Sequence, residues 1–144
     1  MKKLSSFCRS SQIGGGLKDY FLHKLKLVKL PDGRYDVIGD VNFNDLGLTS
    51  LTEMPIRIRK VTGNFGCSYN KLTTLEGAPE YVGGSFSCDS NQLVTLKGAP
   101  KYVGGHFGCS TNYLISLEGA PEHIGGGFFA KVTNSEPSKV LQNT

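Results

Sequence analysis

A segment of 18 residues occurs three times in this chain, at a fixed interval of 21 residues. It reads CSYNKLTTLEGAPEYVGG from Cys67, CDSNQLVTLKGAPKYVGG from Cys88 and CSTNYLISLEGAPEHIGG from Cys109. Tandem repeats with a period of about 20–29 residues are typical of solenoids, in which each repeat forms one coil and coils stack on their neighbours. The repeat therefore predicts a stack of similar coils.

The repeats extend on both sides of these segments in one common register. Each unit opens with Val or Ile, has Phe four positions later, and has Cys or Ala two positions after the Phe. These positions are Val61, Val82, Val103 and Ile124; Phe65, Phe86, Phe107 and Phe128; and Cys67, Cys88, Cys109 and Ala130. An earlier, degenerate unit has Val41 and Phe43 at the Phe and Cys positions, and about three extra residues around 58–61. We expect about four to five coils over residues 37–130.

The pattern within a unit predicts an extended segment followed by an irregular return. Phe86 and Cys88 are two residues apart, so both point into the core while Ser87 points away from it. Asn91 ends the strand, where its amide can bond backbone groups that have no ladder partner. The glycines of EGAP and VGG permit positive φ at chain reversals, and proline favours an extended return without a helix. The prediction is short parallel strands with a non-helical convex side.

Three further columns are consistent with direct stacking of successive units. Two of them alternate in charge, so neighbouring coils place opposite charges side by side. The third column consists of residues with aromatic rings and predicts a stack of rings on the outer side of the solenoid. The columns are Glu76, Lys97 and Glu118; Glu80, Lys101 and Glu122; and Tyr81, Tyr102 and His123.

The two ends of the chain depart from the repeat. In residues 1–36, Leu17, Tyr20 and Phe21 have helical spacing, and the alternating residues around Pro31-Asp32-Gly33 predict a hairpin. We expect this segment to cap the first coil with a helix and a hairpin. At the other end, residues 131–144 form a polar tail without the repeat pattern. The last coil is therefore expected to be covered either by this tail or by another molecule.

The cysteines indicate a structural role. Three of the four cysteines recur in one repeat column without a C-x-x-C motif, and His23, His106 and His123 complete no zinc pattern. We interpret them as small buried residues in a reducing compartment, with no metal and no cofactor. No apolar run is long enough to cross a membrane, and the basic N-terminus lacks the apolar segment of a secretion signal. A cytoplasmic location is expected.

The order F-x-C-x-x-N-x-L has the form L-x-L-x-x-N-x-L of a leucine-rich repeat. The chain resembles the short leucine-rich repeats of bacterial effectors, with EGAP in place of their double-proline piece. The motifs LEGAP and VGG, preceded by DVNFNDLGLTSL, resemble the repeats encoded by bacteriophages in particular. This resemblance covers about residues 37–130. It implies a curved solenoid that binds other macromolecules, and a factor that acts in host takeover or against host defence.

If stacking fixes the core columns, function is expected in the outward columns whose chemistry changes from coil to coil. The candidate partner-binding residues of this concave face are Asn42, Asn44, Asn64, Ser68, Ser85, Ser87, Asp89, His106, Ser110, Phe129 and Lys131. No catalytic residue is predicted, because His106 and Asp89 stand one register apart without an evident oxyanion hole. We therefore expect a non-enzymatic module that binds a bacterial host protein in the host cytoplasm and inhibits or redirects it.

Two other surfaces remain open as alternatives. Residues 1–34 contain eight Lys or Arg and two Asp, a formal charge of +6, whereas the whole chain carries +4. This basic region favours phosphate contacts and hence a nucleic-acid-associated factor. Its candidate residues are Lys24, Lys26, Lys29, Arg34, Arg57, Arg59 and Lys60. The third surface is the C-terminal coil, where Phe128 and Phe129 are candidates for self-association.

Overall fold

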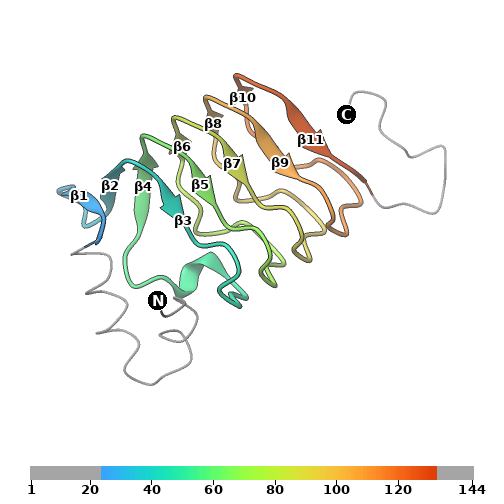
Figure 1. Ribbon diagram of the computed structural model, residues 1–144, viewed down its shortest axis with the longest axis horizontal. Helices are drawn as coiled ribbons and strands as arrows, with labels where there is room; N and C mark the ends of the chain where they lie inside the picture. The colour runs from blue at the N-terminus through green and yellow to red at the C-terminus, as the bar shows by residue number, and fades with distance from the viewer. Residues whose placement is uncertain (1–23, 133–144) are drawn as a thin grey trace.

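The computed structural model describes residues 24–132 and shows a solenoid of stacked coils with two sheets (Figure 1). Sheet A contains β1 (Lys26–Lys29), β2 (Tyr35–Ile38), β4 (Ile58–Val61), β6 (Tyr81–Val82), β8 (Tyr102–Val103) and β10 (His123–Ile124). Sheet B contains β3 (Val41–Asn42), β5 (Phe65–Gly66), β7 (Phe86–Ser87), β9 (Phe107–Cys109) and β11 (Phe128–Ala130). A single turn of 3₁₀ helix, η1 (Leu51–Glu53), is the helical element between the strands. The predicted stack of short parallel strands is confirmed.

Each coil contributes a strand to both sheets, one more than the sequence predicts. The strand at the Phe position is the expected one, and Phe65, Phe86 and Phe107 lie opposite one another in sheet B. The additional strand is the Tyr-Val pair before each double glycine, with Val82 opposite Val103 in sheet A. The double glycine is thus the corner between the two sheets.

The corner glycines are required by close packing between coils. A Cβ atom on Gly104 would lie 2.1 Å from the carbonyl oxygen of Gly83, so no side chain fits between the two backbones. The corner glycines do not have positive φ, and the prediction that they do is wrong. It is right for the EGAP turns, where Gly98 has a φ of 92°.

The core is built from columns of identical residues. Phe86 and Phe107 are fully buried, and the ring of Phe86 stacks on those of Phe65 and Phe107 at centroid distances of 5.3 Å. Phe128 ends the column with its ring turned edge-on, at 87° to that of Phe107. Cysteine and two leucines per coil complete the buried set. The predicted core columns are confirmed.

The asparagine column forms a buried hydrogen-bond ladder. The Nδ2 atom of Asn91 donates to the carbonyl oxygens of Cys67, Cys88 and Asp89, and its Oδ1 atom accepts from the N–H of Leu72. Asn70 links its own coil to the preceding coil in the same way. The structural role predicted for this column is confirmed.

The ring column lies on the outer side of sheet A. The rings of Tyr81 and Tyr102 stack with centroids 4.5 Å apart, and that of His123 continues the stack at 4.6 Å from Tyr102. The Nζ atom of Lys60 lies 5.0 Å from the centroid of the Tyr81 ring. One of the predicted inter-coil charge pairs, between Lys97 and Glu118, has a distance of 3.6 Å.

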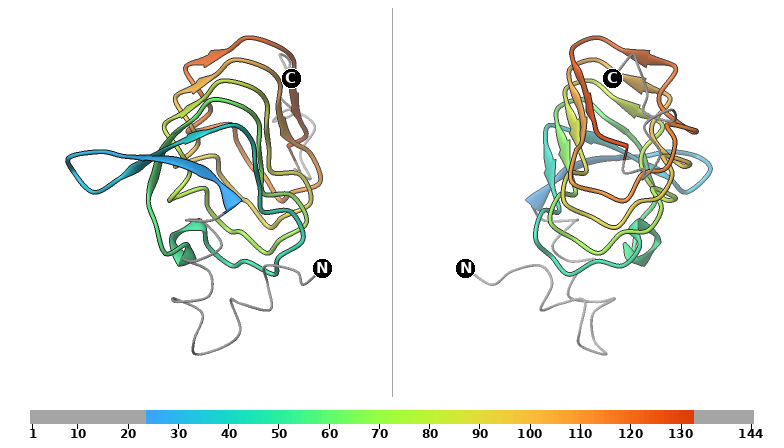
Figure 2. Two further views of the ribbon diagram at one scale, coloured as in Figure 1. Left: turned by 60° about the vertical axis from the view of Figure 1, so that its left-hand side comes forward. Right: turned by 90° about the vertical axis from the view of Figure 1, so that its right-hand side faces the viewer.

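The predicted hairpin is present at the N-terminal end of the stack. β1 pairs antiparallel with β2, and β2 also pairs in parallel with β4, so the hairpin extends sheet A. Its tip projects from the side of the coils (Figure 2). The pairing of β2 with β4 shifts register between Tyr35 and Asp36, opposite the extra residues of the degenerate unit. The helix predicted before the hairpin, and the tail beyond residue 132, lie outside the described residues.

Candidate functional site: the outer face of sheet B

Three parallel columns of side chains form the outer face of sheet B. The middle column stands on the strands themselves, and a leading and a trailing column stand before and after them. The leading column is Asp40, Asn64, Ser85, His106 and Gly127. The middle column is Asn42, Gly66, Ser87, Gly108 and Phe129. The trailing column is Asn44, Ser68, Asp89, Ser110 and Lys131.

The leading column links each coil to the next through one repeated hydrogen bond. Asp40 Oδ1 accepts from the N–H of Asn64, and Asn64 Oδ1 accepts from the N–H of Ser85, both at 2.7 Å. Ser85 Oγ accepts from the N–H of His106 at 3.0 Å, and His106 Nδ1 accepts from the N–H of Gly127 at 2.7 Å. Four different side chains thus perform one task. The column stops at Gly127, which has no side chain to accept from a further coil.

The trailing column repeats this arrangement. The side chain of Asn44 accepts from the N–H of Ser68 at 2.7 Å, and that of Ser68 from the N–H of Asp89 at 3.1 Å. Asp89 then accepts from the N–H of Ser110 at 2.7 Å. In both columns the chemistry varies while an acceptor close to the backbone is retained. That shared property is visible in the sequence, and sequence reasoning missed it by taking variation as a sign of function.

The role of His106 in the leading column gives a specific expectation. His106→Ala removes the acceptor of the Gly127 N–H, and the free energy of unfolding should fall by about 1 kcal/mol. His106→Asn should retain most of this stability, because Asn64 performs the same task two coils earlier. Urea denaturation measures both variants, and amide exchange at Gly127 reports the local bond. Equal losses in the two variants would show that the bond to Gly127 does not matter.

The middle column leaves a groove because its residues are small. At the N-terminal end of sheet B this groove has a volume of about 370 Å³. The predicted site residues that line it are Asn42, Asn44, Asn64, Ser85 and Ser87. The Oγ atom of Ser87 and the Nδ2 atom of Asn42 make no hydrogen bond within the described part of the chain, so both are available to a ligand.

The other predicted residues of this face lie outside the groove. Ser68, Asp89 and Ser110 belong to the trailing ladder, and the side chain of Ser68 is buried. His106 and Phe129 meet at the C-terminal end, where their ring centroids are 5.7 Å apart and Phe129 is 55% exposed. The exposed Lys131 follows the last strand. The predicted residues therefore form a groove at one end of sheet B and an aromatic edge at the other.

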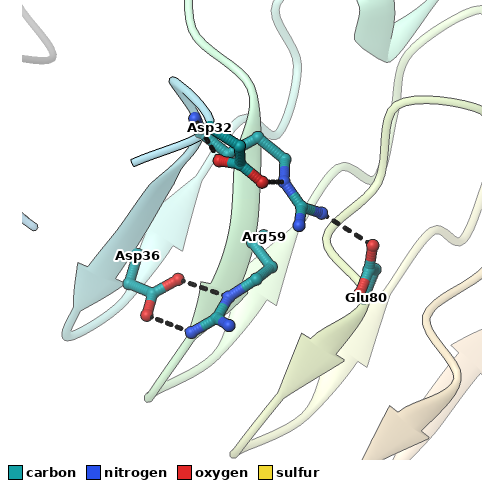
Figure 3. A network of polar contacts seen from close by, with 5 residues as sticks. Asp32, Asp36, Arg59 and Glu80 are labelled. Atoms are coloured by element: carbon teal, nitrogen blue, oxygen red, sulfur yellow. Dashed lines mark hydrogen bonds and ion pairs between the residues drawn. The ribbon is translucent and has the colours of Figure 1, made fainter. Parts of the chain in front are cut away.

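The predicted basic surface is partly neutralised within the chain. Figure 3 shows the network in which the guanidinium of Arg34 bonds Asp32 at 2.8 Å and Glu80 at 2.7 Å, while that of Arg59 bonds Asp36 at 2.6 Å. The backbone N–H and then the guanidinium of Arg34 hold the pKa of Asp32 below its ordinary value. The hydrogen bonds to the carboxylates raise the pKa of Arg34 and of Arg59.

The remaining predicted cations divide into two groups. Lys60 lies over the Tyr81 ring. Lys24, Lys26, Lys29 and Arg57 are exposed and form no ion pair within residues 24–132. Fewer cations are therefore available to phosphates than the sequence suggests.

The three cysteines of the repeat column are free and buried. Burial raises the pKa of Cys109 to about 12 and that of Cys67 further, so these thiols stay protonated at neutral pH. No group of three or more His, Cys, Asp or Glu side chains in the described residues is arranged to hold a metal ion. Within the same part of the chain, no helix has the length and apolar character needed to cross a bilayer.

Comparisons of the chain with known protein families, with curated proteins and with solved structures find no match.

Proposed function

We propose that this protein is a non-enzymatic binding module of the short leucine-rich repeat type, which holds a segment of a partner protein against the outer face of sheet B. The observation that carries the proposal is the groove along the middle column. Its walls present amide and hydroxyl groups, and Ser87 Oγ and Asn42 Nδ2 make no hydrogen bond to any of residues 24–132. Pockets that combine shape with a few unpaired polar groups favour specific binding.

The proposed class of partner rests on the sequence motifs of the repeat. Because LEGAP, VGG and the preceding DVNFNDLGLTSL resemble phage-encoded repeats, we propose a bacteriophage factor that acts in the host cytoplasm. Its partner is then a bacterial host protein, which it inhibits or redirects by covering part of that protein's surface. Fold alone does not determine function, so this part of the proposal depends on the binding experiment.

The experiment is affinity purification from nuclease-treated bacterial lysate with Ser87→Arg as the test variant. An arginine at this position fills the groove without removing a hydrogen bond of either ladder, because Ser87 belongs to the middle column. Recovery of the partner should fall at least about tenfold, the effect of losing a few contacts at an interface centre. Thr73→Arg, an exposed change away from sheet B, is the matched control and should leave recovery unchanged.

The alternative of a nucleic-acid-associated factor is tested by repeating the purification from lysate that has not been treated with nuclease. Lys24, Lys26 and Lys29 carry exposed charges without an ion pair in the described part of the chain. If they bind phosphates, changing all three to glutamine should lower binding, and binding should fall steeply with salt. If neither this variant nor Ser87→Arg alters recovery, both surfaces are wrong. The C-terminal coil with Phe129 is then the surface to test for self-association.

A further inference from the structure

A second recess lies where the repeat is interrupted. It has a volume of about 160 Å³ and shares no residue with the groove on sheet B. It is lined by the segment 51–58, by the Gly77-Ala78 turn of the following coil, and by Arg34 and Glu80. Since a partner on sheet B would not touch these residues, the recess is a separate candidate site.

The recess exists because the degenerate coil stands further from its neighbour than the regular coils do. At the corresponding turns of two regular coils, a Cβ atom on Gly98 would lie 2.5 Å from Glu76 N, and one on Gly119 would lie 2.4 Å from Lys97 N. The equivalent atom on Gly77 would lie 3.0 Å from the nearest atoms, in Leu51 and Thr52. The turn is therefore packed more tightly against the preceding coil at Gly98 and Gly119 than at Gly77, where it meets Leu51 and Thr52.

The floor of the recess is apolar. Leu51, Ile56 and Ile58 are buried, and Met54 and Ala78 are half-buried around them. An apolar cavity of about 150 Å³ is large enough to take up a benzene molecule. The recess thus has the size for one apolar side chain, the form in which interface anchors are usually buried.

Arg34, Arg57 and Glu80 line the rim of the recess, and Arg57 is the member of this set that has no ion-pair partner among residues 24–132. The Glu80 carboxylate is already paired with Arg34, which also bonds Asp32. Arg57 is exposed, and its guanidinium makes no ion pair or hydrogen bond within residues 24–132. A guanidinium favours a carboxylate, which it can bond through two parallel N–H groups.

We propose that this recess binds an apolar side chain together with a neighbouring carboxylate from an acidic segment of a partner protein. The apolar side chain occupies the floor formed by Leu51, Ile56 and Ile58, next to Ala78. The carboxylate bonds Arg57 at the rim. The irregular coil is thus a second binding site, independent of the face proposed above.

The test is an NMR titration of the full chain with two small probes. N-acetyl-leucine carries an apolar side chain and a carboxylate, while N-acetyl-leucinamide has the same side chain without the charge. Both should shift the amide signals of Gly77 and Ala78, and the acid should bind about tenfold more tightly because of its charge-assisted bond. Equal binding of the two probes, shifts confined to other residues, or no shifts at the highest soluble concentration would overturn the proposal.

Three variants make the test specific. Arg57→Gln should abolish the preference for the acid while leaving the binding of the amide unchanged, and Ala78→Leu should block both probes by filling the floor. Lys71→Gln removes an exposed charge elsewhere and should change nothing. Retention of the preference in Arg57→Gln contradicts the assignment of the carboxylate site. Ser87→Arg should bind both probes normally. The two proposals are therefore independent: the recess can fail this test while the proposed function stands, and the proposed function can fail while the recess binds both probes.

Discussion

Replacing Asn91 by alanine is expected to lower the free energy of unfolding by about 4 kcal/mol, because it leaves the N–H of Leu72 without an acceptor and removes three further buried hydrogen bonds. The carbonyl oxygens of Cys67 and Cys88 each lose one of two asparagine donors and keep the other, from Asn70 and Asn112 respectively. Asn91 itself is 6% exposed, so water does not easily replace the lost bonds. Since these groups belong to adjacent coils, the change weakens the contact between coils as well as one turn.

Urea denaturation of Asn91→Ala measures this effect, with Gln92→Ala as the control. Gln92 is the next residue, its side chain is exposed, and its backbone N–H bonds Leu72 O whatever the side chain. The control should change the free energy of unfolding by less than about 0.5 kcal/mol. A loss below about 1 kcal/mol in Asn91→Ala would show that the ladder contributes little to stability.

The second large effect is expected from Gly104→Ala at the corner between the sheets. The new Cβ atom would lie 2.1 Å from the carbonyl oxygen of Gly83, and this contact is with backbone, which cannot move aside like the end of a side chain. The two coils must separate, and we expect a loss of about 3 kcal/mol, the upper part of the range for overpacked sites. Gly104 does not have positive φ, so the backbone conformation itself permits alanine.

Gly108→Ala is the matched control, because it adds the same methyl group to the following strand. Its Cβ atom would meet the carboxylate oxygens of Asp89 at 3.2 Å, a contact that a small side-chain rotation relieves. Alanine also restricts the unfolded chain, which favours the folded state by about 0.4–1 kcal/mol. The control should therefore be close to wild type in thermal or urea unfolding. Similar losses in both variants would mean that close contact at the corner is not the reason for the double glycine.

Much of the fold could be predicted from the register of the sequence repeat. The positions of Phe86, Cys88 and Asn91 recur without insertion over the regular units, so burial and the turn at Asn91 follow from spacing alone. The stack of Tyr81 on Tyr102 follows in the same way, since identical positions of adjacent coils must lie one above the other. These features depend on the period, which the sequence displays directly.

Other features depend on distances between packed atoms, which cannot be read from the repeat period. The strand at Tyr81–Val82 is only two residues long, too short for an alternation of apolar and polar residues to be visible. The double glycine after it has the same composition as a positive-φ turn, although its cause is the approach of Gly83 to Gly104. The groove and the recess come from missing side chains and from an irregular coil, and neither leaves a motif.

The candidate site also shows why variation between repeats is a weak sign of function. Asn64, Ser85 and His106 differ in charge, size and chemistry, yet each accepts the N–H of the next coil. The hydrogen-bonding requirement selects an acceptor near the backbone, and several residue types meet it. Within residues 24–132, the fold makes no hydrogen bond or ion pair through the side chains of Ser87 and Arg57, so substitutions there separate binding from stability.

A NOESY spectrum of the labelled protein tests most directly whether successive coils lie in register. Stacking as described here predicts contacts between residues 21 positions apart, above all between the rings of Phe86 and Phe107 and between those of Tyr81 and Tyr102, whose centroids are 5.3 Å and 4.5 Å apart. The amides of these residues should show strand-type contacts to the adjacent coil. Absence of these contacts, or a series of helical contacts through residues 72–96, would contradict the stacked architecture and both proposed sites.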